Sequence, residues 1–181
     1  MRTWLSSELD RMALEGTSAV LDLGGGDRVV QEYSRDLEIG EFCADQGIGL
    51  LEAFFLGPDL EDFGHVLQII ASSDLKASRI MLVLNEGVIR QGQSTDGVFE
   101  PLTTRPEFAD LLAKGVRPVF MRRLTCMEVL RERGLGFYAA VDGAVDREGK
   151  PPSPTLRHMV KVWLRQNETA HEEAGTIEWL P

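Results

Sequence analysis

The sequence predicts an α/β domain with a parallel sheet of about four or more strands and helices on both faces. Two observations indicate this class. Short apolar segments alternate with amphipathic helical segments along the whole chain, without an internal repeat. The apolar segments are apolar throughout, which is typical of parallel strands buried on both faces rather than of strands with one exposed face. Helices between parallel strands then cover both sides of the sheet.

Four apolar segments account for the predicted strands. They lie at residues 18–23, 48–56, 79–85 and 116–121. The first runs directly into three glycines, a density that a strand cannot accommodate, so the chain is expected to turn sharply at Gly24. The second ends at Gly57-Pro58, the third ends at the polar residue Asn85, and the fourth is followed by two arginines.

Helical periodicity fills the intervals between these strands and continues to both ends of the chain. The predicted helices cover residues 4–15 and begin near Arg28, Asp59, Pro106, Thr125 and Ser153-Pro154. Thr125 and Glu128 have the spacing of a capping box, and Gly134 is placed to end that helix. From about Gln166 the chain is polar and acidic, and we expect it to fray.

Length and composition fit one cytoplasmic domain. The 181 residues are enough to bury a substantial core, and two cysteines are too few for a disulfide framework. The sequence has no signal-peptide core and no apolar run near the roughly 20 residues of a membrane helix, so we expect no membrane association. We expect residues 1–150 to form the main α/β unit, with residues 151–181 as a helix and polar tail packed on it.

The net charge of the chain indicates which classes of partner are expected. The chain has 19 Lys and Arg against 29 Asp and Glu, a formal net charge of −10. Nucleic-acid backbones attract basic domains, so nucleic acid is not the expected partner of the whole chain. A local basic face that includes Arg117, Arg122 and Arg123 stays open as an alternative.

The first candidate site follows the strand predicted at residues 18–23. Asp22 lies near the end of this strand, and the turn after it contains Gly24, Gly25, Gly26 and Asp27. A carboxylate at a strand end can hold Mg²⁺ through water, so Asp22 is the candidate metal-side residue. The backbone amides of a glycine-rich turn can line an anion. The alternative is a tight turn in which glycine lets two elements pack closely.

The second and third candidates also follow predicted strands. Asn85 and Glu86 come at the end of one strand, and an Asn side chain offers the donor and acceptor that suit the edge of a purine. The alternative is an Asn that satisfies local backbone groups. Arg122 and Arg123 follow the last strand and can meet either phosphate or neighbouring acidic side chains. Parallel strands place their carboxyl ends at one edge of a sheet, where α/β proteins bind ligands.

Taken together, these segments resemble the ParA/MinD-type P-loop ATPases, over about residues 17–140. Ala19-Val-Leu-Asp-Leu-Gly-Gly-Gly26 is similar to the second Mg²⁺-side motif of that family, and Met81-Leu-Val-Leu-Asn85 is similar to the strand whose Asn contacts adenine. Val116 to Leu124 is similar to the last strand and its exit. The resemblance implies ATP or ADP with Mg²⁺ as ligand, Asp22 on the metal side, and a process such as plasmid partition or conjugal transfer.

The chain departs from that family at its beginning. No Gly-x-x-x-x-Gly-Lys-Ser/Thr occurs anywhere, and nothing else in the fold replaces the phosphate contacts of that loop and its lysine. We therefore expect no ATP hydrolysis by this chain alone. The family's first strand is also missing, which would leave an apolar sheet edge that pairs with other chains. Three alternatives follow: the chain rearranges, it forms a homo-oligomer or binds a partner protein through that edge, or it is part of a longer gene product. We expect a non-catalytic or partner-dependent protein.

Two alternatives stay open. Val20-Leu-Asp-Leu-Gly-Gly-Gly26 is also similar to the first motif of S-adenosylmethionine-dependent methyltransferases. In that family an acid ends the next strand and holds the ribose hydroxyls, whereas here Asp59 comes only after Gly57-Pro58. The other alternative is a purely structural interaction module that binds neither cofactor.

Overall fold

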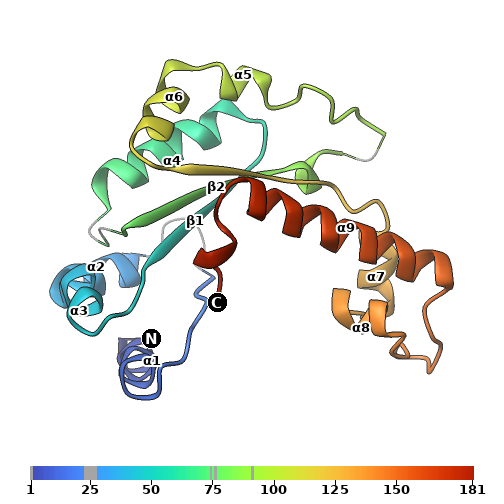
Figure 1. Cartoon of the computed structure of the whole chain (residues 1–181), viewed down its shortest axis with the longest axis horizontal. Coiled ribbons are helices and arrows are strands. Elements are labelled where there is room, and N and C mark those ends of the chain that lie inside the picture. Colours follow the sequence, from blue (N-terminus) through green and yellow to red (C-terminus); the bar gives the residue numbers. More distant parts are fainter. Residues whose placement is uncertain (1, 23–27, 74, 76, 91) are drawn as a thin grey trace.

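A computed structural model describes residues 2–22, 28–73, 75, 77–90 and 92–181 of the chain. In this part, the sheet consists of three parallel strands in the order β1-β2-β3, as Figure 1 shows. The strands are β1 (Leu51–Leu56), β2 (Arg79–Asn85) and β3 (Arg117–Met121). The predicted α/β class and the parallel sheet are confirmed, whereas the prediction of about four or more strands is wrong for the described residues.

Helices flank the sheet and continue to both ends of the chain. They are α1 (Arg2–Glu15), α2 (Arg28–Asp36), α3 (Ile39–Asp45), α4 (Leu60–Ser72), α5 (Glu100–Thr103), α6 (Pro106–Ala113), α7 (Met127–Arg133), α8 (Phe137–Asp142) and α9 (Pro154–Glu173), with short 3₁₀ helices η1 (Glu86–Val88) and η2 (Ile177–Trp179). Two predicted helix starts are confirmed by their side-chain caps. Asp59 Oδ1 accepts the Glu61 N–H at 2.8 Å, and Ser153 Oγ accepts the Leu156 N–H at 3.2 Å.

The first predicted strand is wrong wherever the structure describes it. Residues 18–22 belong to no strand, and their side chains are exposed, Val20 by 80%. Residues 23–27, which contain the predicted glycine turn, lie outside the described residues. A strand needs a neighbour to receive its backbone hydrogen bonds, and among the described residues the only strand paired with β1 is β2. The apolar sequence at 18–22 therefore does not add a fourth strand to the described sheet.

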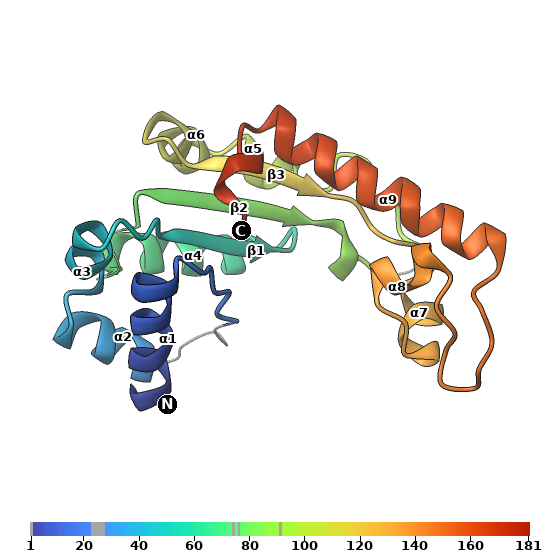
Figure 2. The same ribbon diagram turned by 60° about the horizontal axis from the view of Figure 1, so that its bottom comes forward.

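One face of the sheet carries the largest core cluster. Alternate residues of β1 and β2, including Leu56, Leu82 and Leu84, pack against side chains of α4, α5 and α6. Phe63 of α4 and Leu102 of α5 are fully buried in this cluster. Figure 2 shows α4 behind the sheet, on the side opposite the carboxyl-terminal helix. The burial on both sides of β2 agrees with its continuous apolar sequence.

The opposite face of β2 and β3 is covered by the end of the chain. Met81, Val83 and Val119 are buried there, with Ala170 and Ala174 packed against them. Small side chains at these two positions let the helix approach the strands closely. The prediction that the chain frays from about Gln166 is wrong, because α9 continues to Glu173. The residue that follows its last turn, Thr176, is fully buried.

A hydrogen-bonded turn holds that carboxyl-terminal segment. Thr176 Oγ1 lies 2.9 Å from His171 Nδ1 and donates to the His171 carbonyl oxygen at 3.2 Å. Burial lowers the pKa of His171, because a partly desolvated imidazole favours its neutral form. A neutral ring carries one N–H, so Nδ1 can donate to the Thr176 hydroxyl while the hydroxyl proton goes to the carbonyl oxygen. Some polar residues of this segment, whose composition predicted fraying, therefore form internal hydrogen bonds.

Helices α7 and α8 pack against the amino-terminal half of α9 and form a carboxyl-terminal lobe. Gly134 has φ 64° and ends α7, as predicted. The predicted capping box is wrong, because the cap residue is Cys126 and no side chain caps this helix.

An ion pair also joins segments of this lobe. Arg133 Nε donates to Asp146 Oδ2 at 2.7 Å. The backbone N–H of Lys150 donates to Asp146 Oδ1. This hydrogen bond, together with the Arg133 guanidinium, lowers the pKa of the Asp146 carboxyl.

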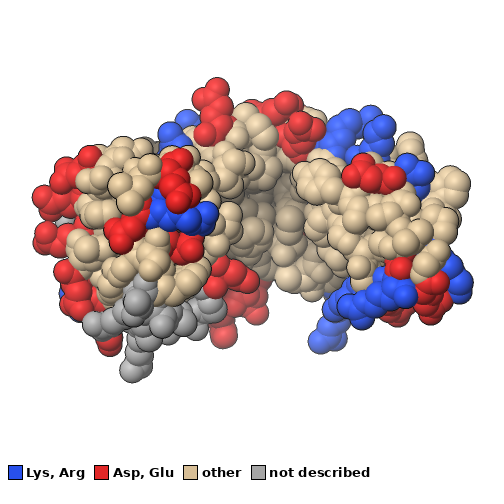
Figure 3. All heavy atoms as spheres, turned by 90° about the horizontal axis from the view of Figure 1, so that it is seen from below, with Lys and Arg blue, Asp and Glu red and all other residues tan. Residues whose placement is uncertain are grey.

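An amino-terminal lobe forms at the other end of the sheet. Leu5 and Leu9 of α1 pack against Ile39 and Cys43 of α3. Figure 3 shows the surface hollowed between this lobe, formed by α1–α3, and the lobe formed by α7–α9. None of the described helices combines the length and apolar character needed to cross a membrane.

Candidate functional site

The carboxyl edge of the sheet brings two of the three predicted site segments together. Asn85 ends β2, and Glu86 follows it in η1. The backbone N–H of Arg123, just beyond β3, donates to Glu86 Oε2 at 3.1 Å. Because β2 and β3 are parallel neighbours, residues 37 positions apart in the chain meet at this edge.

Asn85 has one polar group engaged and one free. Its Oδ1 accepts the Gly87 N–H at 2.7 Å and so caps η1. This is the local backbone role that the sequence left open as an alternative. The amide nitrogen of Asn85 has no hydrogen-bond partner in the described part of the chain, and the residue is half-buried. The free donor is therefore the part of this side chain that can contact a ligand.

Gly87 fits this cap because of its missing side chain. A Cβ at Gly87 would lie 2.8 Å from Asn85 Oδ1, closer than real Cβ contacts. Any larger residue would push the Asn85 side chain out of its capping position. The sequence Asn85-Glu86-Gly87 thus forms one local unit at the end of β2.

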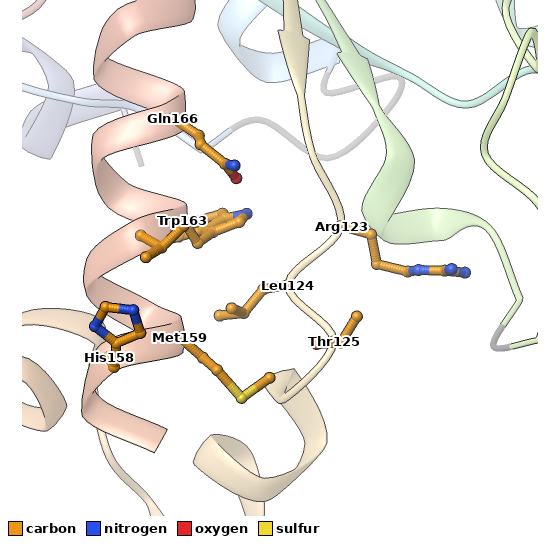
Figure 4. A pocket seen from close by; sticks show the side chains of 8 residues that line it. Arg123, Leu124, Thr125, His158, Met159, Trp163 and Gln166 are labelled. Atoms are coloured by element: carbon orange, nitrogen blue, oxygen red, sulfur yellow. The ribbon is translucent and has the colours of Figure 1, made fainter. Parts of the chain in front are cut away.

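The Arg123 guanidinium binds a loop rather than an acidic side chain. It donates to the carbonyl oxygens of Ile89, Arg90 and Gln93 at 3.3, 3.0 and 3.3 Å. Figure 4 shows the Arg123 side chain directed away from the pocket beside α9. The sequence left phosphate and acidic side chains open as partners of Arg123, and in the described structure its guanidinium pairs with no acidic side chain. Arg123 instead holds Ile89, Arg90 and Gln93 beside the carboxyl edge.

The first predicted segment does not join this edge as a strand. Asp22 is exposed and lies outside the sheet, while Gly24, Gly25, Gly26 and Asp27 fall outside the described residues. Among the described residues, no group of three His, Cys, Asp or Glu side chains could hold a metal ion. The assignment of Mg²⁺ to Asp22 stays a prediction.

Asp59 is already engaged at the start of α4. Its Oδ1 accepts the Glu61 N–H at 2.8 Å, which satisfies one of the free donors of the first helical turn. A carboxylate that holds ribose hydroxyls would have to share this oxygen or use the other one. The structure thus gives Asp59 a structural role and adds no support for the methyltransferase alternative.

A shallow pocket of about 350 Å³ lies between α9 and the segment after β3. Its lining residues are Arg123, Leu124, Thr125, His158, Met159, Val162, Trp163 and Gln166. Figure 4 shows Met159 and Trp163 of α9 directed toward the segment that contains Leu124 and Thr125. Trp163 Nε1 donates to the Arg122 carbonyl oxygen at 2.6 Å, and its ring centroid lies 4.9 Å from that of Phe137.

Sequence reasoning missed this pocket. It identified the apolar stripe of the last helix, including Met159 and Trp163, but periodicity does not show which flank of a stripe stays open. It also missed the Arg123 clamp, because the accepting groups are backbone carbonyls, which leave no residue-type signal in the sequence.

No protein-family model matches the chain, and no curated protein or solved structure matches it significantly. The likeness to ParA/MinD-type ATPases therefore depends on the sequence motifs alone.

Proposed function

We propose that this chain is a P-loop-less relative of the ParA/MinD-type ATPases, a non-catalytic or partner-dependent nucleotide-binding-like protein. The convergence of Asn85, Glu86 and Arg123 at the carboxyl edge of a parallel sheet is the observation that carries the proposal. Parallel sheets bind ligands at this edge, and the free amide donor of Asn85 suits a ring nitrogen of adenine. A link to plasmid partition or conjugal transfer is implied by the resemblance alone.

The residues of this site also limit which parts of a nucleotide the chain can bind. The phosphate-binding loop and lysine are missing from the sequence, and Arg123 is engaged by three carbonyl oxygens. A nucleotide on this chain would therefore be held mainly by its base. Asp22 is the residue assigned to Mg²⁺, by resemblance. Hydrolysis would require phosphate contacts supplied by another chain.

Replacing Asn85 tests the nucleotide proposal. Asn85→Asp keeps an oxygen that can accept the Gly87 N–H but removes the amide donor. We expect Mg-ADP to bind the parent protein, and the variant to weaken that binding at least about fivefold, since a lost hydrogen bond to a buried partner costs about 1–3 kcal/mol. Isothermal titration calorimetry measures both affinities.

A matched control is Asn167→Asp. Asn167 donates to the Trp163 carbonyl oxygen within α9 and lies on another element. This variant should bind Mg-ADP like the parent protein. No heat of binding with Mg-ATP or Mg-ADP, or equal affinities for the parent and Asn85→Asp, would contradict the proposal. Binding of S-adenosylhomocysteine instead would favour the methyltransferase alternative.

The free edge of β1 supports a partner role. Ala53 is exposed and Phe55 is 63% exposed, although both belong to the apolar sequence of a strand. No described residue pairs with the outer edge of β1, so its outward backbone groups can pair with another strand. Figure 3 views the molecule from the side on which β1 is the outer strand, where the surface is hollowed. We infer that a strand of a second copy or a partner protein pairs there.

Phe55→Lys tests this edge. We expect the parent protein to sediment as an oligomer and the variant to sediment as a monomer, because a lysine would be desolvated beside the added strand. Analytical ultracentrifugation measures both species.

Tyr138→Lys on α8 is the matched control, because it changes an aromatic residue that is 74% exposed in the other lobe. It should leave the oligomer intact. A parent protein that is monomeric at all concentrations would contradict self-association through β1.

A further inference from the structure

The segment that leads into α9, together with most of this helix, is unusually basic for this chain. Residues 149–167 contain no Asp or Glu and four Lys or Arg, within a chain of net charge −10. Two of these cations have partners in the same chain. Lys150 pairs with Glu148 at 2.7 Å, and Arg157 donates to the Val141 carbonyl oxygen. Lys161 and Arg165 remain.

Lys161 and Arg165 form one exposed stripe with His158. The three residues are spaced by three and four positions, so they lie on the same side of the helix. All three are exposed, and neither Lys161 nor Arg165 forms an ion pair with any described residue. Two cations without acidic partners attract an anionic binding partner, and this attraction is stronger at low salt.

The stripe borders the pocket beside α9. His158 belongs to both the stripe and the pocket lining. Val162, which lies between Lys161 and Arg165 in the sequence, also lines the pocket. The remaining lining is largely apolar, with Leu124, Met159 and the Trp163 ring, and it contains no acidic residue (Figure 4). A concave apolar surface of this size takes one large apolar side chain.

We propose that this surface of α9 binds an acidic protein segment that inserts one large apolar side chain into the pocket. Lys161 and Arg165 attract the acidic residues, and the pocket supplies the desolvated contact. Residues 1–115 have 20 acidic against 9 basic side chains, so a long nucleic acid would be repelled by most of the molecule. A flat anionic membrane would leave the concave pocket unfilled. The proposal does not depend on nucleotide binding.

The test uses the full chain and a fluorescein-labelled peptide of glutamates with one central phenylalanine. Fluorescence anisotropy at low salt measures its affinity. We expect binding that weakens at least about tenfold in the double variant Lys161→Glu/Arg165→Glu, since reversing both charges replaces attraction with repulsion. A peptide with serine in place of phenylalanine should bind similarly weakly. Lys114→Glu/Arg117→Glu reverses two exposed cations at the opposite end of β3 and should bind the peptide like the parent.

Other outcomes overturn the proposal. These are no binding of the glutamate–phenylalanine peptide, equal binding of the serine peptide, or equal weakening by both charge-reversed variants. Binding of duplex DNA or phosphatidylserine vesicles without binding of the peptide would assign the surface to those partners instead. Asn85→Asp should leave peptide affinity unchanged, so failure of this proposal and failure of the nucleotide proposal are distinguishable.

Discussion

Leu84→Ala is expected to lower the free energy of unfolding by about 3 kcal/mol. Leu84 lies on the central strand β2 and is fully buried. It belongs to the cluster that joins this strand to Phe63 of α4 and Leu102 of α5. Removing three carbon atoms there loses their transfer free energy and leaves a cavity that the surrounding strands and helices fill only partly. Because both faces of β2 are covered, little rearrangement is open to its backbone.

Urea denaturation followed by circular dichroism measures this loss. Leu112→Ala on α6 is the matched control, because the same change is made where the side chain is 41% exposed. It should cost less than about 1 kcal/mol. If both variants lost the same small amount, the cluster around Leu84 would not be the main source of stability.

Arg123→Met is expected to release Ile89, Arg90 and Gln93 from the carboxyl edge of the sheet. The change removes the hydrogen bonds to the Ile89, Arg90 and Gln93 carbonyl oxygens but keeps much of the side-chain length. Hydrogen bonds to a charged group contribute about 1.5–3 kcal/mol each when buried, and less where water replaces them. With two of the three bonds exposed, we expect a loss of about 2 kcal/mol in the stability of this loop.

Hydrogen exchange with mass spectrometry reads this loop directly. Residues 86–99 should exchange faster in Arg123→Met, while β2 keeps its protection. Arg122→Met changes the adjacent, exposed arginine and should leave exchange unaltered, because the Arg122 side chain forms no hydrogen bond with any residue that the structure describes. Equal protection of the loop in the parent and in Arg123→Met would show that the clamp does not hold it.

Elements whose signals are local in sequence were predicted well. β2 has the predicted bounds of residues 79–85, and α4 begins after the predicted cap Asp59. Apolar periodicity, caps and the left-handed glycine at Gly134 depend on residues within one or two turns of each other. Such contacts can be read from the order of the residues.

Elements that depend on distant contacts were not predicted. Residues 18–22 have a strand-like sequence but no described neighbour to pair with. The short helices α5 and α8 lack strong start signals and are held by fully buried residues, Leu102 and Ala140. Isolated helices of this length are unstable in water, so packing decides whether they form.

The candidate site also has some features that the sequence predicted and others that it did not. The polar residues Asn85 and Glu86 after β2 were identified as the end of a strand, and the parallel sheet brings Glu86 to Arg123. The role of Arg123 was not predictable, because its guanidinium could equally have met phosphate, a carboxylate or backbone carbonyls. Its bonds cross at least 30 residues and depend on how the loop after η1 folds back.

By itself the sequence determined the α/β class, the bounds of β2, the caps of α4 and α9, and the absence of a phosphate-binding lysine motif. Only the tertiary structure decided that β1 is an edge strand in the described sheet, that Arg123 clamps a loop, and that a pocket opens beside α9. The physical reason is the range of the interactions. Caps and periodicity act within a few residues, whereas strand pairing, clamps and pockets form between segments that only the folded chain brings into contact.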